Sequence, residues 1–425
     1  MIRRISFFFV ALVLLGALAA CGGGSSKNTT TTSTDSTAEP TAAGSPAVTR
    51  QQTATSTEAA SPAETTTANS TASAETTATG TASSTASGNF GYGFNVYARG
   101  DENGADFNSK TIDAVKGAGF NWVRIQVQWK SLEPAKNQYD PLPLDRVVQQ
   151  YQDSGVSILA SVVKAPDWAL DPTGNQLLAN YSDWEGFMHF LAERYKGKIA
   201  AYEIWNEENL ASEMGGTVRI EDYAHLLQGG YAGAKMADSN AVIVFGGLTP
   251  TGVNDPSIAI DDQKYLQQFY QYQNGAFTKY FDVLGMHVSA TNNPPDTMYP
   301  DNPGPDGWSD DPSFYFRRAE QLHQVQVQNG DHRPVWITEF GWSTKNEAKG
   351  YEYGADITPQ DQADYLVGAF DWAKKNWPWT TAMFVWNLNY AVVSDPADEK
   401  YPWAVVNSDW SPRPAYTALK DMPKS

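Results

Sequence analysis

Two glutamates lie where short apolar runs end, about 130 residues apart in a chain of 425. Glu207 follows the run AYEIWN, and Glu339 lies within VWITEFG. A neutral carboxyl can donate a proton to a leaving oxygen, while an ionised carboxylate acts from the other side of the same bound group. If the fold brings them together, the two form the pair that cleavage of a glycosidic bond requires. Each glutamate alone could instead be the buried partner of an arginine, because structural ion pairs also perturb carboxylates.

The elements that must position these glutamates recur along the chain as short apolar or β-branched runs, each followed by a polar loop and a longer amphipathic stretch. The eight runs are 90–96, 122–127, 157–163, 200–205, 241–247, 283–288, 335–341 and 382–388. The amphipathic stretches are 108–118, 144–154, 182–195, 221–238, 262–273, 313–329, 359–376 and 412–422. Repeated strand and helix indicate a parallel α/β sheet, and eight repeats predict a single (β/α)8 TIM barrel.

Helix N-termini are predicted by two local patterns. Ser182 precedes Glu185 at capping-box spacing, and Thr358 stands before Pro359 as an N-cap before a proline at the first helical position.

A barrel of this kind carries its active site at the carboxyl ends of its strands. Glu207 follows the fourth run and Glu339 lies in the seventh, so both are predicted to emerge at the same end, from strands that face each other across the opening. Arg124, in the second run, is a candidate counter-charge that keeps Glu339 ionised. Burial and mutual repulsion would then raise the pKa of Glu207.

Other chemistries lack their usual signatures. The loop after the first run, 95–107, has neither a GxGxxG nor a Walker pattern, and the chain has no GxSxG. The five histidines show no HExxH spacing, so we expect no metal and no cofactor. The loop 291–312, rich in Asp, Asn and Pro, lacks EF-hand spacing for calcium and is expected to wall a substrate cleft.

The segments IWNEEN and ITEFGW together resemble the clan A glycoside hydrolases, with family 39 and family 5 closest in pattern. The resemblance implies that Asn206 binds the sugar 2-hydroxyl, that Glu207 is the acid/base and that Glu339 is the nucleophile. It also implies retention of configuration, for which the two carboxyl groups should lie ~5–5.5 Å apart.

The same resemblance extends from about Phe90 to Lys420. Arg124 corresponds to the arginine that contacts the nucleophile, Trp168 belongs to a Pro-x-Trp turn, and Trp386 matches the aromatic floor beneath the cleaved sugar. His287 would sit in the sugar site, although many relatives have a tyrosine two residues later where this chain has Ser289. Core packing remains the alternative for His287 and for both tryptophans.

The N-terminus predicts export. Residues 1–20 have the pattern of an export signal, in which Arg3 and Arg4 precede an apolar run from Ile5 to Ala20 that is too short for a membrane span. Leu18-Ala19-Ala20-Cys21 resembles a bacterial lipobox. Cys21, the only cysteine, is therefore the expected lipidation site, and an ordinary secretory signal is the alternative. Residues 21–88, almost entirely Ser, Thr, Ala, Gly and Glu, predict a disordered linker that holds a catalytic domain at 89–425 outside the bacterial membrane.

The composition of the chain limits the classes of molecule that it is expected to bind. A net charge of −18 argues against nucleic acid and against membrane contact other than through the anchor. The 14 tryptophans suit a carbohydrate, whose C–H faces stack on aromatic rings. We expect a monomeric hydrolase of β-linked polysaccharide or oligosaccharide. The alternatives are a transglycosylase that uses the same two carboxylates and a non-catalytic barrel that binds glycans at the cell surface.

Overall fold

The computed structural model describes residues 90–300 and 311–424. Three predictions fall outside the described residues: the signal 1–20, lipidation at Cys21 and the linker 21–88.

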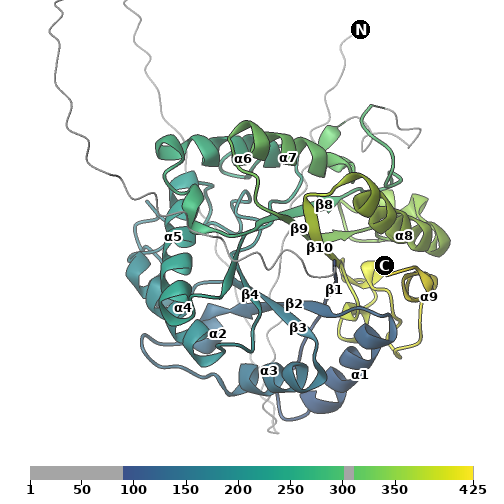
Figure 1. Ribbon diagram of the computed structural model, residues 1–425, viewed down its shortest axis with the longest axis horizontal. Coiled ribbons are helices and arrows are strands. Elements are labelled where there is room, and N and C mark those ends of the chain that lie inside the picture. The colour runs from purple at the N-terminus through teal and green to yellow at the C-terminus, as the bar shows by residue number, and fades with distance from the viewer. Residues whose placement is uncertain (1–89, 301–310, 425) are drawn as a thin grey trace, which may run out of the picture. The chain divides into compact units, whose positions relative to one another are not determined.

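Eight parallel strands form a ring around the centre of the described domain (Figure 1). The strands are β1 (Gly91–Asn95), β2 (Trp122–Gln128), β3 (Ser157–Val163), β4 (Ala201–Ile204), β5 (Val242–Phe245), β8 (Leu284–Ser289), β9 (Val335–Gly341) and β10 (Thr380–Val385). Their order is β5-β4-β3-β2-β1-β10-β9-β8. A parallel bridge between Val244 and Val283 joins the two outermost strands, so the predicted barrel is confirmed.

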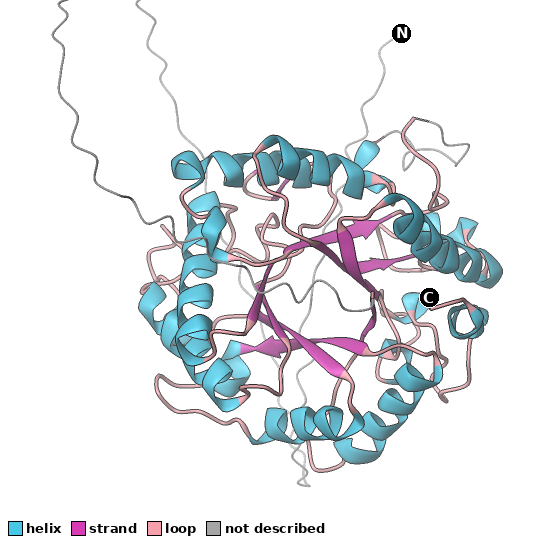
Figure 2. Ribbon diagram, in the orientation of Figure 1, coloured by secondary structure: helices cyan, strands magenta, loops and turns pink. Residues whose placement is uncertain are grey.

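Helices surround the strands as an outer layer (Figure 2). They are α1 (Gly104–Gly117), α2 (Trp129–Leu132), α3 (Leu142–Ser154), α4 (Tyr181–Arg194), α5 (Ile220–Ala237), α6 (Asp262–Gln271), α7 (Arg318–Gln328), α8 (Pro359–Asn376) and α9 (Pro414–Asp421). A small hairpin, β6 (Asn254–Asp255) with β7 (Ala259–Ile260), was not predicted. Within the described ranges, we find no helix that combines the length and apolar character needed to span a bilayer.

The inward face of the barrel changes character along the strands. Alternate strand residues share a face, and β2 pairs with β3 so that Arg124 stands opposite Leu159. Toward the strand N-termini a small buried apolar cluster includes Leu159, Ala201 and Phe384. Two residues farther along β4, the same face carries Glu203. The apolar floor therefore gives way to charged side chains at the carboxyl ends of the strands.

Two predicted helix starts differ from the structure. The cap of α4 is Asn180, whose side chain accepts from the Ser182 backbone N–H, so the cap lies two residues before the predicted Ser182. The stretch 313–329 is not one helix, because a short 3-10 turn at Pro312–Phe314 precedes α7. The predicted start at Thr358 is confirmed, and Asp361 completes a capping box there.

Candidate active site

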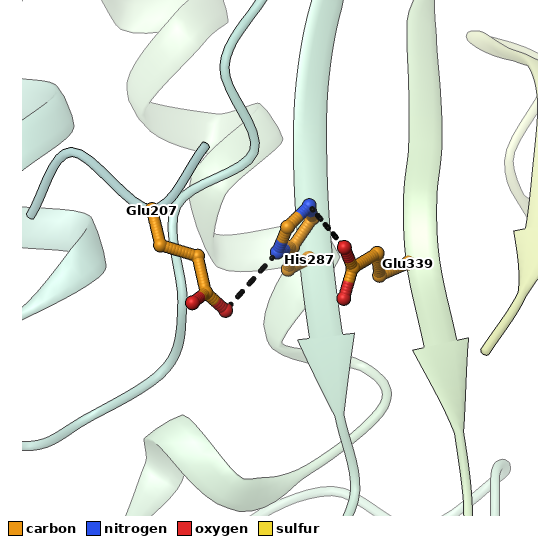
Figure 3. A group of neighbouring side chains, drawn as sticks. All are labelled: Glu207, His287 and Glu339. Carbon is orange, nitrogen blue, oxygen red and sulfur yellow. Dashed lines mark hydrogen bonds and ion pairs between the residues drawn. The ribbon is translucent and has the colours of Figure 1, made fainter. Parts of the chain in front are cut away.

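Glu207, His287 and Glu339 meet at the carboxyl end of the barrel (Figure 3). Glu207 follows β4, while His287 and Glu339 are paired in the register of β8 and β9. Nδ1 of His287 lies 3.4 Å from a Glu207 oxygen, and Nε2 lies 3.7 Å from a Glu339 oxygen. One oxygen of Glu207 and one of Glu339 lie within 4.8 Å of each other. Both carboxylates can therefore contact the same part of a bound molecule.

Arg124 is the cation that organises Glu339. Its side chain is 1% exposed, and its Nη1 donates to Glu339 Oε1 at 2.5 Å and to Asn95 Oδ1 at 2.8 Å. Nη2 donates to Asn206 Oδ1 at 2.6 Å, and Nε donates to Glu203 at 2.6 Å. Although burial disfavours a charged guanidinium, attraction to Glu203 and Glu339 raises the pKa of Arg124 above its ordinary value. The guanidinium is therefore charged, and its hydrogen bonds fix its orientation beside Glu339.

The two carboxylates differ in their electrostatic surroundings. Burial raises the pKa of Glu207 to about 7, which the nearby Thr249 hydroxyl and Arg124 only partly offset. Burial also raises the pKa of Glu339, but this carboxylate directly accepts from Arg124, which favours its ionised form. At neutral pH a substantial fraction of Glu207 is therefore protonated, while the Arg124 hydrogen bond favours an ionised Glu339 beside it.

A second layer of carboxyl groups lies beneath the site. Glu203 and Glu208 are completely buried. Within the described residues, one oxygen of Glu203 and both oxygens of Glu208 have no hydrogen-bond partner. Burial raises the pKa of Glu208 well above its usual range. Burial of this kind favours the neutral form of the Glu208 carboxyl.

The backbone around Glu207 is strained. Trp205 has φ of 69° and Glu207 has φ of 52°, in the left-handed region that non-glycine residues rarely adopt. The Glu207 N–H donates to Gly247 O at 3.0 Å. A Cβ at Gly247 would stand 2.1 Å from a His287 ring carbon, so only glycine lets this loop approach the imidazole. Strain of this kind concentrates at functional sites.

The structure brings together five of the seven predicted site residues: Arg124, Asn206, Glu207, His287 and Glu339.

Trp386 directly follows β10, is partly exposed and packs against Tyr390 with ring centroids 5.1 Å apart. Trp168 is placed differently: its indole N–H donates to the Glu133 carbonyl, and its ring packs edge-on against Trp129.

Tyr390 is a site residue that the sequence did not reveal. It lies in a short 3-10 turn after β10, and burial together with the negative charge of Glu339 raises its pKa above the ordinary value. Ser289, at the position of the expected tyrosine, ends β8 opposite Gly341. Tyr390 therefore places a phenol near the charge of Glu339 from a different strand end. In the sequence, the one feature that links Tyr390 to the site is its position four residues after Trp386.

The cluster of Glu207, His287 and Glu339 also has the composition of a metal-binding group. No sequence spacing could have predicted this, because the three residues come from three separate strands.

A family model described as cellulase, glycosyl hydrolase family 5, matches residues 91–391. The chain belongs to this family. It is therefore a glycoside hydrolase, whose substrates are polysaccharides or oligosaccharides. A search of curated proteins found no match.

Solved structures share the fold at low sequence identity. A family 39 glycoside hydrolase from Bacteroides cellulosilyticus WH2 is 17% identical with a TM-score of 0.58, covering 78% of this chain and 63% of its own. A GH5_18 protein from Streptomyces cattleya, solved with GlcNAc, is 13% identical with a TM-score of 0.58 and 79% coverage of both chains. An exo-β-1,4-mannosidase from Opitutaceae bacterium strain TAV5 is 14% identical with a TM-score of 0.52, covering 79% of this chain and 60% of its own. This chain thus covers less than two thirds of the length of the family 39 enzyme and of the mannosidase.

Proposed function

We propose that this glycoside hydrolase cleaves β-linked polysaccharide or oligosaccharide with retention of configuration, through a covalent glycosyl-enzyme intermediate. The observation that carries the proposal is the approach of Glu207 and Glu339 oxygens to within 4.8 Å. Retaining enzymes have carboxyl groups ~5–5.5 Å apart, whereas inverting enzymes leave ~6.5–9.5 Å for a water molecule. The close approach of these oxygens favours the retaining arrangement.

The two glutamates have separate tasks in this mechanism. Glu339, ionised beside Arg124, attacks the anomeric carbon, and the bond to the leaving oxygen breaks as Glu207 donates its proton to that oxygen. Glu207, now a carboxylate, then takes a proton from water, which attacks the anomeric carbon and releases Glu339. Asn206, held by Arg124, is placed to bind the sugar hydroxyl next to the anomeric carbon.

A glycan-binding barrel without activity is the rival function. Binding alone does not require an acid whose pKa is raised to about 7 within reach of an ionised partner. The arrangement of Glu207 and Glu339 therefore favours catalysis.

The stereochemistry of the first product tests the mechanism. NMR spectra recorded during the first minutes of cleavage should show a product with the anomeric configuration of the substrate. A product of opposite configuration would exclude the covalent intermediate. The substrate itself should be sought in a panel of β-glucan, xylan, mannan and bacterial exopolysaccharides, and failure of the purified protein to cleave any member while binding one would favour the rival.

We also propose that the protein is exported and anchored by a lipid on Cys21. The support is the sequence Leu18-Ala19-Ala20-Cys21 after an apolar run. A Cys21→Ala variant should leave the membrane fraction for the soluble fraction when cells are fractionated. A variant that stays with the membrane would refute lipidation at this cysteine.

A further inference from the structure

The imidazole of His287 stands between the two carboxylates in a way that hydrogen bonding alone does not explain. Its side chain is 2% exposed, and its Nε2 has no hydrogen-bond partner in the described part of the chain. This nitrogen faces Glu339, while Nδ1 faces Glu207 at the longer end of the hydrogen-bond range (Figure 3). A buried polar atom of this kind calls for a partner that the protein itself does not supply.

The spacing of the three side chains fits a small cation. One nitrogen of His287 and one oxygen from each glutamate all lie within 4.8 Å of one another. Zinc binds nitrogen and oxygen ligands at ~2.0–2.2 Å, which puts ligands of a tetrahedral site ~3.4 Å apart. Carboxylate movements of about an ångström would therefore close the site around one ion. In residues 90–300 and 311–424, this is the single group of three metal-ligating side chains that meets the distance.

We propose that Glu207, His287 and Glu339 bind one zinc-type divalent ion, and that the bound ion blocks the catalytic centre. The inhibitory part rests on the proposed function, because a metal-bound Glu207 has no proton to give and a metal-bound Glu339 cannot attack. The ion acts as a reversible inhibitor and takes no part in the reaction.

The ligand set selects among metals. One imidazole with two carboxylates suits zinc and its transition-metal neighbours, whereas Mg²⁺ and Ca²⁺ prefer sites built from oxygen alone. Three protein ligands leave a fourth position for water. Arg124 donates to Glu339 Oε1, the same oxygen that faces His287 Nε2, so the ion would bind Glu339 through its other oxygen, Oε2.

Calorimetric titration tests binding without depending on activity. The full chain, free of metal and in buffer without chelator, should bind one Zn²⁺ and show no binding of Mg²⁺ at the same concentrations. The variants Glu207→Gln, Glu339→Gln and His287→Ala should each bind Zn²⁺ at least ~10-fold more weakly. The exposed His332→Ala should bind like the wild type, and Cys21→Ser should do so as well, which excludes the thiol as the ligand.

The outcomes are distinct. No Zn²⁺ binding up to ~1 mM, or unchanged binding in both glutamine variants, would overturn the site. If His287→Ala does not fold by circular dichroism, the nearly isosteric Glu207→Gln carries the test. In activity assays, Zn²⁺ should raise the apparent KM with kcat unchanged, and EDTA should reverse the effect. Zinc binding in a chain that cleaves no glycoside would leave the metal site standing and reject the proposed function instead.

Discussion

Two buried arginines, Arg124 and Arg318, show how differently this molecule treats charge in two regions. Arg318, at the start of α7, is 2% exposed and donates to both oxygens of Asp262 and to Asp261, at the beginning of α6. Its remaining donor group reaches the Gln321 and Gln263 side chains. Asp261 caps α6, so the carboxylates also favour the positive end of that helix. Each charged side chain in this outer cluster makes an ion pair, although burial and the neighbouring Asp261 raise the pKa of Asp262 to about 6.

The cluster around Arg124 also pairs one arginine with two carboxylates, Glu203 and Glu339, but more of its polar atoms lack a hydrogen-bond partner. Glu203, Glu208 and His287 have polar atoms without a hydrogen-bond partner there, and burial raises the pKa of both Glu207 and Glu339. Matched charges fix the relative position of two helices, whereas unmatched charges leave groups whose protonation can change when substrate arrives. The comparison shows that the Arg124 cluster, at the end of the barrel where catalysis is proposed, keeps several buried polar atoms without a hydrogen-bond partner.

The largest effect is expected from removing the proposed nucleophile of the Arg124 cluster. Glu339→Ala should lose at least ~10⁴-fold in kcat/KM, because no other group can attack the anomeric carbon. Added azide should restore turnover of an activated aryl glycoside by entering the vacated side. The glycosyl azide should then have inverted configuration by NMR. Near-native activity in this variant would show that Glu339 is not the nucleophile.

Removing the acid should give a smaller and more selective loss. Glu207→Ala should slow substrates with poor leaving groups by ~10²–10⁴-fold and activated substrates much less, because only the former need a proton on the departing oxygen. Azide should give a product of retained configuration. Equal losses on both kinds of substrate, measured as kcat/KM, would contradict the acid assignment.

Removing Arg318 from the outer cluster should lower the stability of the protein and leave its catalytic rate nearly unchanged. Arg318→Met leaves Asp262 buried without its cation and should lower the free energy of unfolding by about 3–5 kcal/mol in urea titration. The double variant Arg318→Met/Asp262→Asn should recover part of the loss. At a temperature where the variant remains folded, kcat/KM should stay within about twofold of wild type. A large change in rate would mean that the two arginine clusters are coupled.

The buried carboxyl of Glu208 should make the free energy of unfolding depend on pH. Because the pKa of Glu208 is raised in the folded state, the folded protein holds a proton that the unfolded chain releases above about pH 4.5. Stability should therefore fall as pH rises above that value, by about 1.4 kcal/mol per pH unit from this group. Glu208→Gln should remove that slope in urea titrations at several pH values, and the exposed Glu102→Gln should not. Parallel slopes in wild type and Glu208→Gln would mean that Glu208 is ionised.

The smallest expected effect is on the pH profile of the rate. Activity needs Glu207 protonated, so kcat/KM should fall to half at about pH 7 and continue downward at higher pH. The profile should be recorded with EDTA present, so that metal ions do not occupy the carboxylates. Glu207→Gln should abolish this basic limb on an activated substrate. A plateau from pH 6 to pH 9 in the wild type would show that a different group donates the proton.

Much of the fold could be predicted because hydrophobic periodicity is local. Each of the eight strand runs lies within a few residues of an observed strand, and the Thr358 cap follows from the adjacent residues Thr358 and Pro359. The errors also have local causes. Asn180 caps α4 better than Ser182 because its side chain already reaches the Ser182 N–H, and a separate turn interrupts the residues before α7.

The site could be predicted only in part. Strand ends gave Glu207 and Glu339, but the distances among them depend on how barrel closure directs side chains from distant segments. The sequence contained no sign that His287 would bridge the two carboxylates, or that Glu208, beside the expected acid, would be buried without a partner. These properties arise from packing across the ring, to which neighbouring residues contribute little.

The seam of the barrel has a consequence for how activity depends on assembly. The ring closes where β5 meets β8, through a bridge from Val244 to Val283 and a bond from the Phe245 N–H to the Val283 carbonyl. One half of the chain carries Glu207, and the other carries His287 and Glu339. Neither half contains both Glu207 and Glu339. Turnover is therefore a property of the closed ring alone, and two fragments divided at the seam would reconstitute it only by associating, at a rate set by their concentrations.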